Sequence, residues 1–298
     1  MKIALLGTGL MGRAMVKRLL ILGHTLVVYN RTREHAVPLE EHGARVADSP
    51  EQAIESSEAV ILMLRDAGAI GDVMFPENRQ RPELEGRTVI QMGTILPAES
   101  IALAQQVKRS GGEYLEAPVL GSTSEVGKGT LCVMVGAEHA QFQKWTPLLQ
   151  SFSSEPLHIG SVGQAAALKL ALNQLIASQT AAFSYSLGII QKRGVDIECF
   201  MGILRESALY SPQFDKKLPL MRIRDFSNPN FSTKNLLKDV DLILEEGRSL
   251  GLETAAFEGV RKVVRKALDQ GFTETDYSSL YNAVVPEDPD HNTGKNSA

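Results

Sequence analysis

The N-terminus of the chain places a strand, a glycine-rich turn and a helix in immediate succession. An apolar run at residues 3–6 precedes the letters GTGLMG and a helical stretch that ends at Gly23. In such a turn Gly7 allows the tight bend, Gly9 lets a pyrophosphate approach backbone N–H groups, and Gly12 permits close packing of helix on strand. The order of these parts predicts a dinucleotide-binding turn. Its predicted cofactor contacts are Gly7, Thr8, Gly9, Leu10, Met11 and Gly12.

The 298 residues show two different patterns of predicted secondary structure. Up to about residue 160, helical stretches alternate with short apolar runs, at Ile3 to Leu6, Thr25 to Tyr29, Ala59 to Leu64, Thr88 to Met92, Tyr114 to Glu116 and Leu131 to Val135. This alternation predicts βαβ units in a mainly parallel sheet. Later segments are helical, beginning with a helix over Gln164 to about Lys192 that is apolar on more than one face.

These two patterns predict the fold class: an α/β Rossmann domain followed by an all-α domain. We expect the Rossmann domain at 1–162 and the helical domain at 163–285, with the turn-rich SSEPLHIGSVG as the boundary. The polar residues 286–298 are expected to form a disordered tail, because they are rich in Pro, Asp and Asn.

The second predicted strand ends at Asn30-Arg31-Thr32, where NAD-binding chains place an acidic residue on the ribose hydroxyls. An arginine flanked by two small hydrogen-bonding residues suits a 2′-phosphate instead. We therefore expect NADP (NADPH) as the cofactor, with NAD as the second choice; Arg33 could share the role of Arg31. Two further strand ends, at Leu64-Arg65 and at Thr94, would face the same crevice.

One lysine interrupts the apolar run GQAAALKLALNQL, residues 163–175. Burying an unpaired ammonium is costly, although most such lysines reach solvent with their tips. Asn173 lies one turn after Lys169, on the same face of the expected helix. A lysine beside a carbonyl oxygen can donate a proton as hydride reaches the carbon, so Lys169 is a candidate general acid.

Charge and hydropathy exclude several classes of partner. The net charge is −4, and the basic residues are scattered, so no basic stripe can neutralise a nucleic acid. No apolar run approaches the roughly 18 residues that span a bilayer. Because Met1 leads directly into the first strand without a signal-peptide layout, we expect a cytoplasmic protein with no membrane contact. Cys132 and Cys199 lie in apolar runs, which predicts buried reduced thiols and no metal site.

Four segments together resemble the β-hydroxyacid dehydrogenase family over roughly residues 1–285. GTGLMG is similar to the cofactor loop of that family, and EAPVLGSTSEVGKGTL (116–131) to its substrate loop. GQAAALKLALNQL resembles the catalytic Lys-Asn segment, and NLLKDVDL (235–242) a conserved Lys-Asp pair. The resemblance implies a helical second domain of the 6-phosphogluconate dehydrogenase type and a homodimer or homotetramer. It also implies a reaction: reduction of a short carboxylated aldehyde, or oxidation of the matching hydroxy acid.

The resemblance also implies roles for particular residues. Lys169 would be the general acid/base with Asn173 beside the substrate oxygen, and Lys238 would approach the nicotinamide with Asp239 as its local partner. The residues implied to line the cofactor are Leu64, Arg65, Thr94 and Lys238, and those implied to bind substrate are Gly121, Ser122, Thr123, Asn173 and Lys238.

The substrate loop departs from the family pattern. Leu120 stands where the family has serine, Ser122 replaces a glycine, and Glu125-Val126 replaces a Gly-Ala pair. Backbone N–H groups near Gly121 and the Ser122 hydroxyl can still capture a carboxylate. Glu116 in place of aspartate has no evident consequence in the sequence.

Two other functions remain open. Imine reductases resemble this two-domain plan, but they generally carry another residue in place of Lys169. A dinucleotide-binding dimer module without catalysis is the alternative from a different class, although its members usually replace the lysine as well.

Overall fold

The computed structural model describes residues 1–76 and 83–286. The chain forms two compact units, Met1–Ala171 and Leu172–Ala298. The division falls within one long helix, α7 (Gln164–Lys192), whereas the sequence analysis placed the domain boundary just before this helix.

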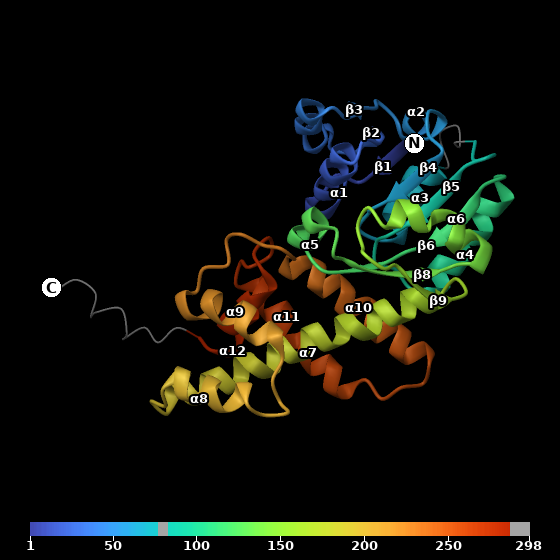
Figure 1. Ribbon diagram of the computed structural model, residues 1–298. Helices are drawn as coiled ribbons and strands as arrows, with labels where there is room; N and C mark the ends of the chain where they lie inside the picture. Colours follow the sequence, from blue (N-terminus) through green and yellow to red (C-terminus); the bar gives the residue numbers. More distant parts are fainter. Residues whose placement is uncertain (77–82, 287–298) are drawn as a thin grey trace. The chain divides into compact units, whose positions relative to one another are not determined.

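The first unit is built on a nine-stranded sheet (Figure 1). The strands are β1 (Lys2–Leu6), β2 (Thr25–Tyr29), β3 (Arg45–Val46), β4 (Ala59–Leu62), β5 (Thr88–Gln91), β6 (Glu113–Glu116), β7 (Val119–Leu120), β8 (Cys132–Gly136) and β9 (Leu157–Gly160). Along β3-β2-β1-β4-β5-β6 every pairing is parallel, which is the doubly wound order. β8 then pairs antiparallel with both β6 and β7, and β9 pairs parallel with β8. The predicted α/β Rossmann domain is confirmed.

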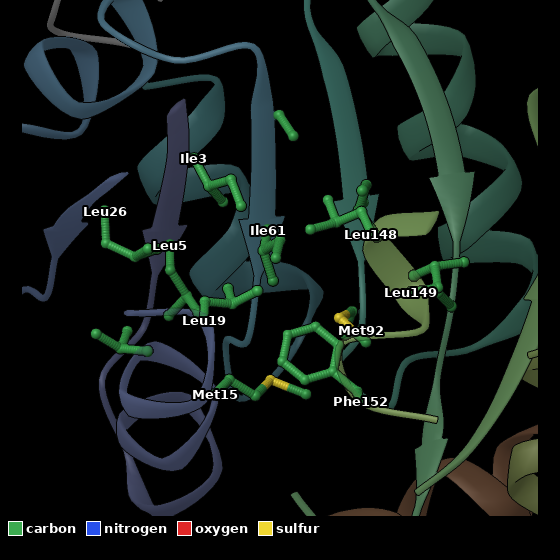
Figure 2. Close-up of a cluster of buried hydrophobic side chains, with 14 of the residues drawn as sticks. Ile3, Leu5, Met15, Leu19, Leu26, Ile61, Met92, Leu148, Leu149 and Phe152 are labelled. Carbon is green, nitrogen blue, oxygen red and sulfur yellow. The ribbon is translucent and has the colours of Figure 1, made fainter. Parts of the chain in front are cut away.

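Helices cover both faces of this sheet because successive strand residues point to opposite sides. The helices of the first unit are α1 (Leu10–Ile21), α2 (Pro50–Glu55), α3 (Ala67–Met74), α4 (Pro97–Arg109), α5 (Thr123–Lys128) and α6 (His139–Leu149), with 3₁₀ turns η1 (Arg33–His35) and η2 (Val37–His42). Ile3 and Leu5 pack on one side with α1 and α6, as Figure 2 shows for Met15 and Leu148. Ala4 and Leu6 belong to a second core on the other side.

Each of the six apolar runs forms a strand, with ends shifted by at most two residues. The sequence analysis missed β3, β7 and β9. The first two are only two residues long, too short to show a period. β9 lies within SSEPLHIGSVG, which we took for a linker because its glycines and serines are typical of turns.

The second unit is all-helical, as predicted. After the shared helix α7 it contains α8 (Ile197–Arg205), α9 (Pro212–Ile223), α10 (Thr233–Ser249), α11 (Ala255–Asp269), η3 (Tyr277–Ser279) and α12 (Leu280–Val284). α7 packs into two separate cores: Phe183 and Leu187 into one, and Ala177 into the other. The predicted extent of this helix and its burial on more than one face are therefore confirmed.

Both cysteines are free, but the prediction that both are buried was wrong. Cys199 is exposed because the core side of α8 is formed by Met201 and Leu204. Cys132 on β8 is partly exposed. No helix within residues 1–76 and 83–286 is long and apolar enough to cross a bilayer. The predicted disordered tail, apart from Pro286, lies outside the described residues.

Candidate active site

The glycine-rich turn between β1 and α1 has the form that a pyrophosphate requires. Gly7 has φ +102°, and a Cβ atom there would lie 2.3 Å from the carbonyl oxygen of Met63. A Cβ at Gly12 would lie 1.9 Å from the carbonyl oxygen of Gly7, so the helix packs closely on the turn. At Gly9, in contrast, no atom of another described residue beyond its chain neighbours lies within 4 Å of such a Cβ, which leaves room for a ligand to approach the backbone.

Polar groups at the turn also fit an anion. α1 begins after Gly9 with neither a side-chain cap nor an acidic residue in its first turn, so no carboxylate of the helix's own first turn occupies its N-terminal N–H groups. The Thr8 backbone N–H donates to Asn30 Oδ1 at 3.0 Å, which ties the turn to the end of β2. Thr8 Oγ1 is buried and has no partner among the described residues. A hydroxyl in that state is suited to a ligand oxygen.

The residues expected to select the cofactor lie at the end of β2. The Asn30 Nδ2 donates to the carbonyl oxygen of Thr32 at 2.8 Å and so shapes the turn. Arg31 is exposed and makes no hydrogen bond or ion pair with the described part of the chain. Arg33, the second candidate, pairs with Asp48 at 2.7 Å. Arg31 is therefore the better candidate for a 2′-phosphate.

Two further strand ends meet the glycine-rich turn. A Cβ at Gly7 would lie 3.0 Å from Leu64 Cδ2, and a Cβ at Gly93 would lie 2.7 Å from the carbonyl oxygen of Leu64. The loops after β1, β4 and β5 are thus neighbours, as the topology predicts. Arg65 turns to Asp66, 2.7 Å away, while Thr94 stands partly exposed in the loop after β5.

The predicted substrate loop follows β7 and leads into α5. Gly121 has φ +135°, and Ser122 is the N-cap of the helix that begins at Thr123. Both the N–H and the hydroxyl of Ser122 donate to Glu125 Oε2, at 2.8 and 2.5 Å. The Ser122 donors that the sequence analysis assigned to a substrate carboxylate are thus held by a carboxylate of the chain itself.

Glu116, to which the sequence analysis gave no role, holds the start of α7. Its side chain is 1% exposed, and Oε1 accepts from the backbone N–H groups of Gly163, Ala165 and Ala166 at 2.8, 2.9 and 3.3 Å. The first turn of a helix has unpaired N–H groups, and a carboxylate satisfies them well. Lys169 lies about one turn farther along the helix. Glu116 therefore fixes the segment that carries the candidate general acid.

The second carboxylate oxygen of Glu116 takes part in buried hydrogen bonds with Ser100 and, through it, Tyr114. The Ser100 hydroxyl donates to Glu116 Oε2 at 2.5 Å, and the Tyr114 hydroxyl lies 2.8 Å from Ser100 Oγ. Gly136, paired with Glu116 across β6 and β8, makes room for this side chain: a Cβ at Gly136 would lie 2.2 Å from Glu116 Oε1.

The protonation of Glu116 predicts how stability depends on pH. Burial raises the pKa of this carboxyl, and the hydrogen bonds from Ser100 and α7 offset the rise only in part. The folded chain then keeps the proton to a higher pH than the unfolded chain, so the stabilisation is complete below about 4.5 and is lost as pH rises. Because glutamine resembles the protonated form, Glu116→Gln should match wild type at pH 4 and become relatively more stable by pH 7. Urea unfolding at both pH values measures the difference, and a wild-type advantage that grows with pH would contradict it.

In the second unit three predicted residues form one linked set. Asn173 and Asp239 are buried, 3% and 2% exposed, and Asn173 Nδ2 donates to Asp239 Oδ2 at 2.6 Å. Lys238 Nζ lies 2.7 Å from Asp239 Oδ1, which is the local pairing that the resemblance implied. Since Asn173 Nδ2 is engaged, the amide presents Oδ1, which is buried without a partner in the described residues. Lys169, 9% exposed, lies one turn earlier on α7.

The fold and the glycine-rich turn define a dinucleotide-binding protein. Residues 2–160 match the family described as the NAD binding domain of 6-phosphogluconate dehydrogenase. Residues 163–284 match the one described as NAD-binding of NADP-dependent 3-hydroxyisobutyrate dehydrogenase. The chain belongs to the β-hydroxyacid dehydrogenase family.

One relative supports this assignment, and two solved structures share the fold. Glyoxylate/succinic semialdehyde reductase 1 of Arabidopsis thaliana is 30% identical over 95% of this chain and 98% of its own length. A solved 3-hydroxyisobutyrate dehydrogenase of Mycobacterium tuberculosis has the same fold, with a TM-score of 0.82, 22% identity, and coverage of 95% of this chain and 98% of that one. An imine reductase of Myxococcus stipitatus reaches a TM-score of 0.66 at 19% identity, with the same coverage.

Proposed function

We propose that the protein is an NADP(H)-dependent oxidoreductase that reduces a short aldehyde, or oxidises the matching hydroxy compound, with Lys169 as general acid/base. The proposal rests on three buried polar residues. Lys169 and Asn173 lie one turn apart on α7, and Asp239 accepts a hydrogen bond from the Asn173 side-chain amide. Short carboxylated aldehydes such as succinic semialdehyde and glyoxylate are the reference substrates, because the Arabidopsis relative is named for them.

Each residue has a part in this reaction. The bound cofactor supplies hydride to the carbonyl carbon. The Lys169 ammonium gives a proton to the carbonyl oxygen, and in the reverse direction the neutral amine removes it. Asn173 can accept a hydrogen bond from the Lys169 ammonium or from the hydroxyl of the reduced product, since its Oδ1 has no other partner in the described chain. Asp239 fixes the orientation of that amide.

The cofactor would be held by residues of the first unit. The turn at Gly7 to Gly12 and the N-terminus of α1 suit the pyrophosphate, and the Thr8 hydroxyl can bond one of its oxygens. Arg31 suits the 2′-phosphate. Leu64, Arg65, Thr94 and Lys238 are proposed to line the nicotinamide half.

The test is the initial rate of NADPH oxidation, with NADH alongside, on succinic semialdehyde, glyoxylate, tartronate semialdehyde and methylmalonate semialdehyde, each beside an uncharged aldehyde of similar length. Turnover of at least one aldehyde supports the proposal. Turnover of a cyclic imine alone would replace it with imine reduction. Tight NADPH binding with no turnover of any carbonyl or imine would favour the non-catalytic module.

Cofactor preference is expected to depend on Arg31. Arg31→Ala should weaken NADPH binding about tenfold or more, because a hydrogen-bonded charge on the phosphate is lost, and should change NADH binding little. Fluorescence titration of both dinucleotides measures this. Arg33→Ala is the matched control with a smaller expected effect, since Arg33 is paired with Asp48. Equal weakening of NADPH and NADH by Arg31→Ala would remove the argument for NADP.

A homodimer or homotetramer is the proposed assembly. Leu175, Tyr185 and Ile189 are each at least half exposed on α7. At 3.6 residues per turn the three positions fall within an arc of roughly 80°, so they lie on one side of the helix. A second copy of the chain would remove this apolar surface from water. We expect light scattering to give at least twice the 32.5 kDa chain mass, and Ile189→Asp to shift the population towards monomer; a monomeric wild type would contradict the proposal.

A further inference from the structure

The loop assigned to substrate carries its own carboxylate in a fixed place. Glu125 Oε2 receives both Ser122 donors, and the loop backbone packs on the stem of the glutamate: a Cβ at Gly121 would lie 3.2 Å from Glu125 Cβ. The Val126 N–H donates to the carbonyl oxygen of Ser122 at 3.1 Å, which closes the same turn. The Glu125 carboxylate is therefore held in one position by hydrogen bonds and packing within the loop.

A second residue of the loop also disfavours a carboxylate. Leu120 ends β7, in register with Cys132, and is partly exposed. It offers an apolar surface and no hydroxyl at this position. An incoming carboxylate would thus find the Ser122 donors occupied, a like charge beside them and an apolar neighbour, so it would lose hydrogen bonds and meet repulsion.

We propose that Glu125 is a specificity-determining residue, which excludes a substrate carboxylate from this loop and makes an aldehyde with an uncharged end the preferred substrate. The inference rests on the proposed function, because it takes Gly121 and Ser122 as substrate contacts. Exclusion of this kind is a common route to specificity, since a repulsive element separates two ligands as well as an attractive one does.

A plain structural role for Glu125 makes a different prediction. A glutamate three residues after a serine N-cap is the usual capping box, and capping alone has no effect on the choice of substrate. Glu125→Gln separates the two roles. The glutamine Oε1 can accept the same two bonds from Ser122, so the cap remains, while the negative charge is removed.

The experiment compares kcat/KM for succinic semialdehyde and for butanal, which differ in the carboxylate, with NADPH as the reductant. We expect wild type to favour butanal, and Glu125→Gln to raise kcat/KM for succinic semialdehyde about tenfold to a hundredfold with butanal changed less than about twofold. Glu41→Gln is the matched control, because it removes an exposed charge from η2 in the same unit and should change neither value.

The outcomes separate this inference from the proposed function. If wild type favours succinic semialdehyde, or if Glu125→Gln leaves the ratio of the two kcat/KM values unchanged, Glu125 does not determine the choice of substrate. If wild type reduces neither of these aldehydes, the loop is tested by calorimetry with succinate on the NADP-bound protein, and the proposed function fails only if the rest of the aldehyde panel is also not reduced. Tighter succinate binding to Glu125→Gln, by about tenfold, would then support exclusion, and equal binding would overturn it.

Discussion

Replacing Lys169 with alanine should lower kcat by about two to four orders of magnitude, because the carbonyl oxygen loses its proton donor. NADPH binding should stay near the wild-type value, since the residues proposed to hold the dinucleotide are elsewhere in the chain. Stopped-flow or steady-state NADPH oxidation measures the first effect, and fluorescence titration the second. The two together distinguish a lost catalytic group from a damaged protein.

The controls for Lys169 come from the same helix. Lys192→Ala removes an exposed lysine near the end of α7 and should leave kcat unchanged. Lys169→Arg keeps the charge but holds its proton too tightly to transfer it, so it should remain inactive. A folded Lys169→Ala protein with near-normal turnover would show that another group protonates the oxygen.

Replacing Glu116 with alanine is the substitution expected to destabilise the fold most. It leaves the Gly163 N–H group, two N–H groups of the first turn of α7 and the Ser100 hydroxyl without their buried acceptor. Unsatisfied buried donors are costly, so we expect a loss of about 3 to 5 kcal/mol in the free energy of unfolding. Turnover should fall as well, because the turn that precedes Lys169 loses its anchor. Urea unfolding measures the stability.

Glu113→Ala gives the comparison on the same strand. Glu113 is exposed at the start of β6 and pairs with Lys144, so its loss should cost about 1 kcal/mol or less. Equal destabilisation by the two alanine variants would mean that the contact between Glu116 and α7 adds no more to the free energy of unfolding than an exposed ion pair does.

Local periodicity was enough to predict most of the fold. Ala59 to Leu62 are apolar throughout because both faces of this strand are buried in a parallel sheet. β3 and β7 could not be predicted, because their two residues pair only in a register set by neighbouring strands. The exposure of Cys199 depends on which side of α8 meets the core, and the apolar composition of that helix does not reveal this.

Candidate site residues could be proposed from the sequence where a motif is contiguous, as at the turn after Gly7 and at the Lys169-Asn173 pair. The contacts of Glu116 with α7 and of Asn173 with Asp239 join residues 47 to 66 positions apart, and no local pattern marks them. The bond between Ser122 and Glu125 is different: a serine followed three residues later by a glutamate is the known sign of a capping box, and could have been recognised.

The missing side chain at Gly136 has an evolutionary consequence. Glu116 reaches α7 through space that any larger residue at position 136 would fill, so the two positions are not independent. Gly136→Ala should be harmful, and Glu116→Asp should not rescue it, because a Cβ at position 136 would also lie 2.7 Å from the Cγ atom that the shorter acid keeps. Lineages with an acid at position 116 would have to keep the glycine opposite it.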